Sequence, residues 1–246
     1  MIRRETLLRV VAPLLVFGAL YLGWEWVAQN LKSILPPFAN IIAEFGKRPL
    51  FYLDNLGVTL ANALVGFAFG AGSAVLLAVL MVYFGFLRMA IIPVALLLNV
   101  TPVVAISPAL IVAFGFNAVP HIIVASVAAF FPLLINAMTG LSAIDREAHD
   151  VFRALSASRT EVFLRLRLPS SLPHLFAGAK LSITSAMVGS VVSEFMGTSK
   201  GLGATIVLAT NFLNLSQMWA AIFLSALTSL VLVGIVTLAE RLVIRW

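Results

Sequence analysis

The chain contains no cysteine among its 246 residues. Disulfides, thiol catalysis and cysteine-based metal sites are therefore excluded. Charged side chains are scarce as well: Asp, Glu, Lys and Arg make up 11% of the residues, whereas a soluble domain carries about 25%. The chain also lacks the G-x-x-x-x-G-K-[ST] motif of a phosphate-binding loop, so any ATP binding must lie on another chain.

Residues that could carry chemistry are few and dispersed. His121, His149 and His174 show no metal-ligand spacing. No nucleophile is paired with a base in a recognisable constellation. We therefore expect no catalytic, cofactor-binding or metal residues on this chain, and a protein that is not an enzyme.

What the sequence has in abundance is apolar surface, with 61% hydrophobic residues and a mean hydropathy of +1.08. A soluble core of this length would leave sticky patches exposed, whereas lipid removes that problem. We expect an all-α integral membrane protein with one domain over residues 1–246. The net charge of +6 would suggest nucleic acid for a soluble protein. Here the basic residues lie between apolar blocks, which the positive-inside rule explains without a nucleic-acid partner.

Six segments are long and apolar enough to cross a bilayer, which takes about 20 residues. They cover roughly residues 8–28, 58–84, 90–114, 119–141, 177–195 and 217–238. The first could be misread as a secretory signal. It is longer than the apolar region of such a signal and shows no clear cleavage site before Gln29, so we expect a retained helix.

Lysines and arginines predict the orientation of these segments. With the N-terminus in the cytoplasm, the cytoplasmic segments hold Arg3, Arg4, Arg9, Arg88, Arg146, Arg153, Arg159, Arg165, Arg167, Arg241 and Arg245. The outer segments hold only Lys32, Lys47, Arg48 and Lys200, and Lys180 lies just inside the fifth span. Cytoplasmic loops are the ones that carry the excess of basic residues. Both termini are therefore predicted to be cytoplasmic in a multi-pass protein.

The longest charged segment, about 142–175, includes the run DVFRALSASRTEVFLRLRLPSSLP from Asp150. Its apolar residues fall at helical spacing in two sets, separated by Ser156-Ala157-Ser158. Ser158-x-x-Glu161 matches a capping box, and Leu168-Pro169 should stop the second helix. We predict a cytoplasmic helix, a tight turn and a second helix. From the pattern alone, the hairpin either docks on a protein or rests on membrane lipid with its arginines at anionic headgroups.

This segment resembles the cytoplasmic loop of ABC-importer permeases, E-A-A-x-x-x-G-x(9)-I-x-L-P. With the end aligned on Leu168-Pro169, Asp150 falls at the Glu position, Ser156 at the Gly position and Leu166 at the Ile position. Serine at the Gly position raises the question of whether the turn needs a positive φ. By resemblance, the residues that couple the chain to an ATPase are Asp150, Val151, Phe152, Leu155, Ser156, Ser158, Glu161, Leu166 and Pro169.

The resemblance covers roughly residues 35–246 and is to the sulfonate/nitrate/taurine branch of permeases, which includes those for thiamine-pyrimidine precursors. The pieces that carry it are Pro102-x5-Pro108, Phe114-Gly115, Phe130-Phe131-Pro132 with Asn136, Leu172-Pro173 with Gly178, Glu194, Gly201-Leu202-Gly203 and Glu240-Arg241. The resemblance implies an inner-membrane importer subunit that acts as two permease copies, with a homodimer as the default. It also implies a cytosolic ATPase dimer that binds ATP and Mg, and a periplasmic or lipoprotein binding protein that delivers a small organic or oxyanion solute.

Polar residues inside the spans are candidates for the translocation path: Asn99, Thr101, Ser107, Asn136, Ser185 and Glu194. Pro102 and Pro108 interrupt the third span, and freed carbonyls are tolerated only beside protein or a water-lined cavity. Helix packing explains serines and small residues equally well. The absence of mid-membrane basic groups favours a neutral or weakly charged solute. The alternative function is an ion-gradient-driven secondary transporter, a class that usually shows internal repeats and intramembrane acidic residues.

Overall fold

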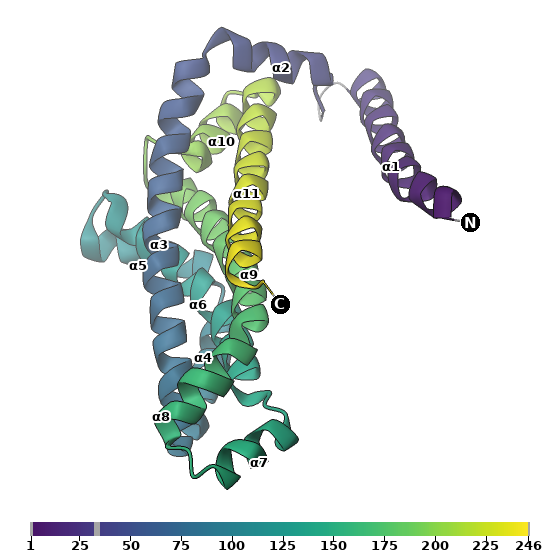
Figure 1. The fold of residues 1–246 in the computed structure, drawn as a ribbon. Helices are drawn as coiled ribbons and strands as arrows, with labels where there is room; N and C mark the ends of the chain where they lie inside the picture. Colours follow the sequence, from purple (N-terminus) through teal and green to yellow (C-terminus); the bar gives the residue numbers. More distant parts are fainter. Residues whose placement is uncertain (1, 32–34, 246) are drawn as a thin grey trace.

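The structure, a computed structural model, describes residues 2–31 and 35–245, and within these ranges every regular element is helical (Figure 1). The helices are α1 (Ile2–Asn30), α2 (Phe38–Lys47), α3 (Pro49–Tyr83), α4 (Gly85–Val100), α5 (Val103–Phe114), α6 (Ala118–Ser142), α7 (Arg146–Ala154), α8 (Arg159–Val162), α9 (Leu168–Ser193), α10 (Leu202–Asn211) and α11 (Leu215–Val243). A π-helical turn (Phe163–Arg167) joins α8 to α9, and a 3-10 turn (Glu194–Met196) follows α9. The predicted all-α class is confirmed. Lys32, predicted to be outside, is not among the described residues.

Five helices are long and apolar enough to cross a membrane: α1, α3, α6, α9 with the turns around it, and α11. The third predicted span, 90–114, is not one helix, because the chain breaks at Thr101-Pro102 into α4 and α5. Pro102 has no N–H to continue the helix, and the residue before a proline favours extended backbone. Thr101 is extended, with φ −68° and ψ 126°, and its Oγ1 donates to the Leu97 carbonyl at 2.7 Å.

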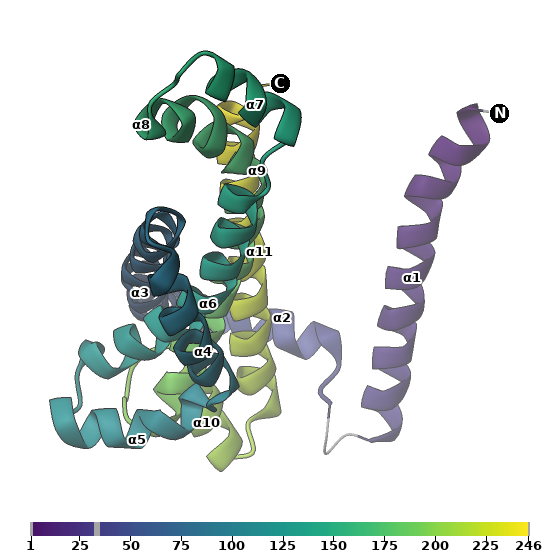
Figure 2. The ribbon, with the colours of Figure 1, turned by 90° about the horizontal axis from the view of Figure 1, so that it is seen from below.

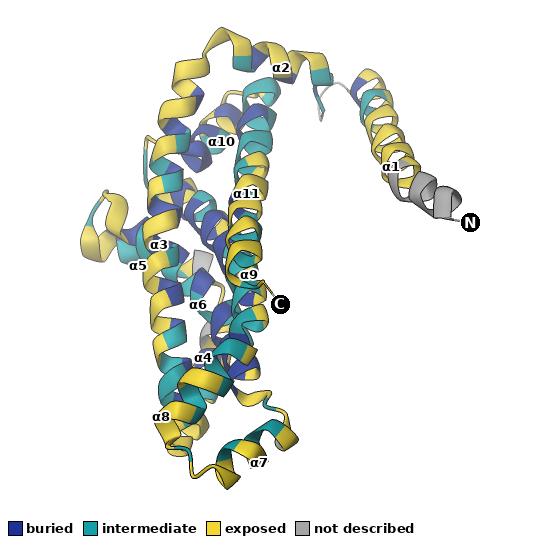
Figure 3. Ribbon diagram, viewed as in Figure 1, coloured by how far each residue is buried: buried dark blue, intermediate teal, exposed yellow. Residues whose placement is uncertain are grey.

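The centre of the fold is formed by α3, α6 and α9, which pack along most of their lengths (Figure 3). Small residues make the contact. A Cβ atom on Gly178 of α9 would lie 2.7 Å from the Asn136 Cβ of α6, and one on Gly70 of α3 would collide with the Ser126 carbonyl. In a membrane, close packing of this kind replaces the hydrophobic effect as the force between helices. The α3–α6–α9 unit is therefore a dense body on which the other elements are placed.

Around that body, α1 and α11 expose apolar side chains along their lengths, such as Phe17 at 70% and Leu230 at 68% exposed. One end of α1 is held to α11 by Trp24, whose ring lies 4.7 Å from that of Trp219. The Glu25 carboxylate accepts the backbone N–H of Phe38 at 2.9 Å, and so it caps the start of α2. The surface of these outer helices suits contact with lipid.

In Figure 2, both termini lie toward the end of the molecule that carries α7 and α8, whereas α10 and the start of α11 lie toward the other end. We call these the loop end and the opposite end. The helix α10 was not predicted. Two predicted spans begin later than the helices themselves, at residue 58 where α3 begins at Pro49, and at residue 177 where α9 begins at Leu168. The helix α2 lies between the first two predicted spans.

Cysteine labelling tests which end faces the cytoplasm. The natural chain has no cysteine, so a single introduced thiol gives a clean signal. Ser199 and Ser170 are both exposed, and they lie at the far and near ends of α9 relative to the loop. Ser199→Cys should react with a membrane-impermeant maleimide in intact cells, and Ser170→Cys should react only after lysis. Labelling of Ser170→Cys from outside would invert the orientation.

Candidate functional site

The loop end carries the segment that the sequence singled out. Its first helix, α7, projects beyond the bundle and makes few contacts with it (Figure 1). Asp145 caps the start of α7 by accepting the N–H of Glu147 at 3.2 Å. At its end, Ala157 N–H donates to the Phe152 carbonyl and Ser156 N–H donates to the Arg153 carbonyl, both at 3.0 Å. This pair of bonds is a Schellman motif, which places the residue at its turn in the left-handed region.

Ser156 occupies that turn with φ +54°. The position that corresponds to the family's glycine therefore does require a positive φ, which an L-residue adopts at a cost of roughly 1–2 kcal/mol. The predicted capping box of α8 is also confirmed. Ser158 N–H donates to the Glu161 carboxylate at 2.9 Å, and Glu161 N–H donates to the Ser158 hydroxyl at 3.3 Å.

The prediction that the second helix stops at Leu168-Pro169 is wrong. The chain passes from α8 through the π-helical turn into α9 without a break, and Pro169 lies in the first turn of α9. The wider turn explains this, because Leu168 N–H donates to the Phe163 carbonyl five residues earlier. A π-turn relaxes the fit that a proline ring would otherwise disturb in a regular helix.

The predicted coupling residues divide by exposure. Val151 is 57% and Leu155 is 74% exposed, and we call these two side chains the apolar tip. Phe152, also predicted to be a coupling residue, is half-buried. The polar members Asp150, Ser156, Ser158 and Glu161 are exposed, and Leu166 and Pro169 are half-buried at the root of α9. An exposed pair of large aliphatic side chains on a polar helix indicates a binding surface.

The predicted path residues are not brought together. Asn99 and Thr101 are exposed at the break between α4 and α5, and Ser107 is fully buried in α5. Asn136 and Ser185 are half-buried, and the Asn136 amide donates to the Pro132 carbonyl of its own helix at 2.8 Å. Glu194 lies apart from these five and is 1% exposed.

Glu194 forms the centre of a buried polar network near the opposite end. Its Oε2 accepts the Thr59 hydroxyl at 2.8 Å and the Gly203 N–H at 3.0 Å, and its Oε1 accepts from Asn62 and Ser190 at 3.4 and 3.3 Å. A buried carboxylate is tolerable only when it is satisfied in this way. The network ties α3, α9 and the start of α10 to one another.

The Gly201-Leu202-Gly203 turn makes room for that carboxylate. Gly201 has φ +107°, and a Cβ atom there would collide with Glu194. Gly201 N–H donates to the Asn55 side chain and Leu202 N–H donates to the Thr59 hydroxyl, both at 2.8 Å. The first N–H groups of α10, which have no partner within the helix, thus find theirs in this network.

Glu194 and the glycine turn were among the residues predicted from the sequence. The α3 residues that surround the carboxylate were not. Asn55, Thr59 and Asn62 follow a helical spacing within α3, so they form one polar stripe on an otherwise apolar helix. That stripe is the signal that could have revealed them. At 1% exposure, the Glu194 side chain is shielded by protein groups and not by interfacial water.

The sequence of this chain is similar to those of known transport proteins. Residues 66–245 match the family described as binding-protein-dependent transport system inner membrane component. The chain is 29% identical over 216 residues to SsuC of Bacillus subtilis, a permease named for aliphatic sulfonate transport, covering 87% of this chain and 78% of SsuC. It is 27% identical over 198 residues to the formylaminopyrimidine transport permease ThiX of Halalkalibacterium halodurans, covering 79% of each chain. It is 28% identical over 218 residues to the nitrate import permease NrtB of Leptolyngbya laminosa, covering 88% and 77%. These similarities give the secondary-transporter alternative no support.

Replacing Ser156 by glycine should stabilise the turn between α7 and α8 by about 1 kcal/mol, because glycine adopts a positive φ without steric cost. Local opening, followed as hydrogen exchange of the amides around residue 157, should slow about fivefold, the factor that 1 kcal/mol corresponds to. Ser170→Gly is the matched control. It lies in the helical backbone of α9, so it should speed local exchange there. Faster exchange at the turn of Ser156→Gly would contradict the strain argument.

Removing the Glu194 carboxylate should destabilise the folded chain by about 3 kcal/mol, because buried donors lose their acceptor and a cavity remains. Glu194→Gln should cost less, since its carbonyl can still accept from Gly203. Glu25→Ala is the control: Glu25 is partly exposed and accepts a single N–H. Thermal unfolding in detergent measures all three. Equal shifts for Glu194→Ala and Glu25→Ala would show that the network contributes little.

Proposed function

Because the chain belongs to the family of binding-protein-dependent transport system inner membrane components, it is the permease subunit of an ABC importer, and we propose that the apolar tip of α7 docks on the ATPase. The observation that carries this proposal is the exposure of Val151 and Leu155 on a helix that stands clear of the bundle. Buried aliphatic and aromatic anchors supply most of the energy at such contacts. The loop end would then face the cytoplasm, in agreement with its arginines.

Coupling requires that force on the loop reaches the membrane helices. The route runs from α8 through the π-helical turn into α9, which is continuous backbone, and α9 packs closely on α3 and α6. Asp150, at the family's acidic position, is exposed beside the tip and would orient the docked helix. ATP and Mg would bind on the partner ATPase dimer, and this chain would hydrolyse no ATP itself.

The family acts with an ATPase and a solute-binding protein, and two permease chains are needed to enclose a path. We propose a homodimer, the default for identical subunits. Asn99 and Thr101, exposed where α4 breaks from α5, are the polar positions best placed to line the path. Broken helices supply solute sites in other transporters because their free backbone groups face a cavity. The binding protein would deliver solute at the opposite end.

The solute proposed is a small organic molecule or an oxyanion. Its support is the similarity to permeases named for aliphatic sulfonates, formylaminopyrimidine and nitrate. These compounds share small size and several hydrogen-bond acceptors. The side-chain amide of Asn99 can donate to acceptors of this kind without a fixed charge, whereas the Thr101 hydroxyl, which donates to Leu97, can accept a hydrogen bond.

Truncating the tip should weaken ATPase binding. Leu155→Ala should remove about 2 kcal/mol if the side chain is buried in the complex, roughly thirtyfold in Kd. Capture of the cognate ATPase in detergent measures the loss, and native mass spectrometry of the wild-type complex should show two copies of this chain. Leu230→Ala, an equally exposed leucine on α11, is the matched control and should leave capture unchanged.

Phe152→Ala is a weaker probe of docking, because Phe152 is half-buried within its own chain and its loss also affects folding. If Leu155→Ala and Val151→Ala both bind the ATPase as tightly as wild type, while the chain remains folded, the apolar tip is not the docking surface. The permease function would stand in that case, since it rests on family membership.

A further inference from the structure

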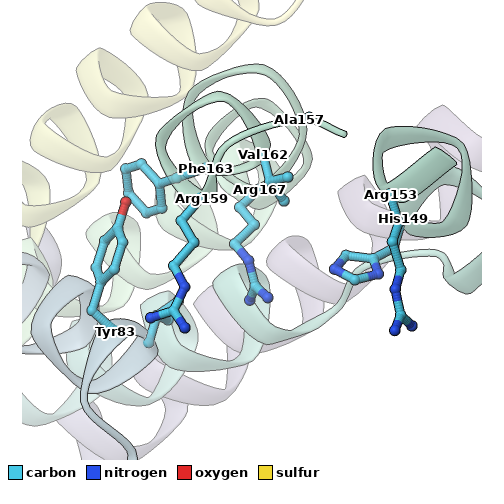
Figure 4. Close-up of a pocket in the computed structure, with 9 residues that line it drawn as sticks. Tyr83, His149, Arg153, Ala157, Arg159, Val162, Phe163 and Arg167 are labelled. Atoms are coloured by element: carbon cyan, nitrogen blue, oxygen red, sulfur yellow. The ribbon is translucent and has the colours of Figure 1, made fainter. Parts of the chain in front are cut away.

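A cavity of about 530 Å³ opens at the loop end (Figure 4). It lies between the C-terminal end of α3, the helices α7 and α8, and the π-helical turn. Four of its lining residues can carry positive charge: His149 and Arg153 from α7, Arg159 from α8 and Arg167 from the π-helical turn. In Figure 4, the side chains of Arg159 and Arg167 run side by side in the same direction, and the His149 ring points from α7 toward them. We call this cavity the basic pocket.

Among the side chains that the structure describes, no acidic one lines the basic pocket. The ion pairs among the described side chains are Lys47–Glu44 and Lys180–Glu240. Neither pair involves a residue of the basic pocket. Glu161, two residues from Arg159, is used by the capping box of Ser158. Arg167 donates one N–H to the Leu141 carbonyl at 3.1 Å, which fixes the guanidinium in place. The other N–H groups of that fork remain for a ligand.

A second cavity, of about 260 Å³, adjoins the basic pocket through Val82 and Arg167 and adds Arg88 to the positive region. No acidic side chain lines this cavity either. Arginines that share one region repel each other, and an anion between them relieves that repulsion. The arrangement therefore favours a negatively charged occupant.

The position of the basic pocket indicates which anion this is. Val82 and Tyr83 end the helix α3, whose 35 residues exceed the about 20 needed to cross the hydrocarbon, so this end of α3 reaches the headgroup region. The Tyr83 ring lies 5.4 Å from that of Phe163, and Phe84 and Phe86 beside them are 51% and 65% exposed. Tyrosine, as an amphipathic aromatic residue, is enriched at the level of lipid headgroups, and Tyr83 fits that level. A phosphate group is the anion that lies at this level in a phospholipid membrane.

We propose that the basic pocket binds the phosphate of an anionic phospholipid headgroup. Guanidinium groups match phosphate through paired N–H donors, and they accept it without losing their own charge. A headgroup there would touch α3, α7, α8 and the root of α9 together, so it would brace the loop against the spanning helices. The site is separate from the apolar tip, and it stands whether or not that tip docks on the ATPase.

Lipid titration of the purified full chain in detergent, read by native mass spectrometry, tests the proposal. Wild type should retain phosphatidylglycerol in preference to phosphatidylcholine. Arg159→Gln should bind phosphatidylglycerol about tenfold more weakly, as expected for one lost charge-assisted hydrogen bond, and Arg153→Gln/Arg159→Gln more weakly still. Both positions are exposed, so the variants should fold. Arg48→Gln is the matched control, an exposed arginine near the start of α3. Its lipid preference should equal that of wild type.

Inorganic phosphate is the second arm of the test. If phosphate raises the melting temperature of wild type but not of Arg153→Gln/Arg159→Gln, while all variants bind phosphatidylglycerol alike, the occupant is a soluble phosphate and the lipid assignment is wrong. If neither phosphate nor phosphatidylglycerol depends on these arginines, the proposal is overturned. Loss of ATPase capture in the double variant, with lipid binding unchanged, would likewise overturn it and assign the arginines to an acidic protein surface.

Discussion

The close approach of α3, α6 and α9 is the constraint on which the other parts of this structure depend. Within a bilayer the hydrophobic effect does not press helices together, so contact has to come from dispersion forces and hydrogen bonds between closely fitted surfaces. Gly66 of α3 shows the fit, because a Cβ atom on it would lie 2.5 Å from the Ala125 Cβ of α6. At that separation, the Ser182 hydroxyl can donate to the Ala129 carbonyl of the neighbouring helix at 2.7 Å. Small residues thus permit both the packing and the polar links between helices.

Charged side chains have different surroundings at the two ends of this packed body. Near the opposite end, Glu194 is enclosed by four donors and by the first turn of α10, so the hydrogen bonds of its carboxyl group are satisfied within the chain. At the loop end, the arginines of the basic pocket meet no carboxylate among its lining residues. A polar side chain whose hydrogen bonds are satisfied within the chain stabilises one conformation, whereas a cluster of charged side chains without internal partners favours binding of an oppositely charged ligand. We infer that the Glu194 network serves the architecture and that the loop end serves recognition.

How far the sequence could predict this structure depended on the range of the interactions involved. The capping box at Ser158 follows from residues within one turn of each other, and it was predicted. The positive φ of Ser156 was anticipated through a family glycine and is explained by a local Schellman motif. Long-range contacts were not visible. Glu194 accepts a hydrogen bond from Thr59, which is 135 residues away in the sequence, and no local pattern indicates that pairing.

The helix continues through Pro169, contrary to the prediction, because of the π-helical turn that precedes it. Proline was expected to end a helix, and in a regular α-helix it would disturb the preceding turn. The π-helical turn before it inserts one additional residue, which rotates the helix on one side relative to the other by about 100°. That rotation lets α8 run into α9 without a loop, and Arg167, in the same turn, reaches the Leu141 carbonyl at the end of α6. A flexible linker here would absorb displacement of α7 and α8. A continuous helix, anchored to α6 at the point where the register changes, is suited to carry such displacement into the α3–α6–α9 body, as the proposed coupling to an ATPase requires.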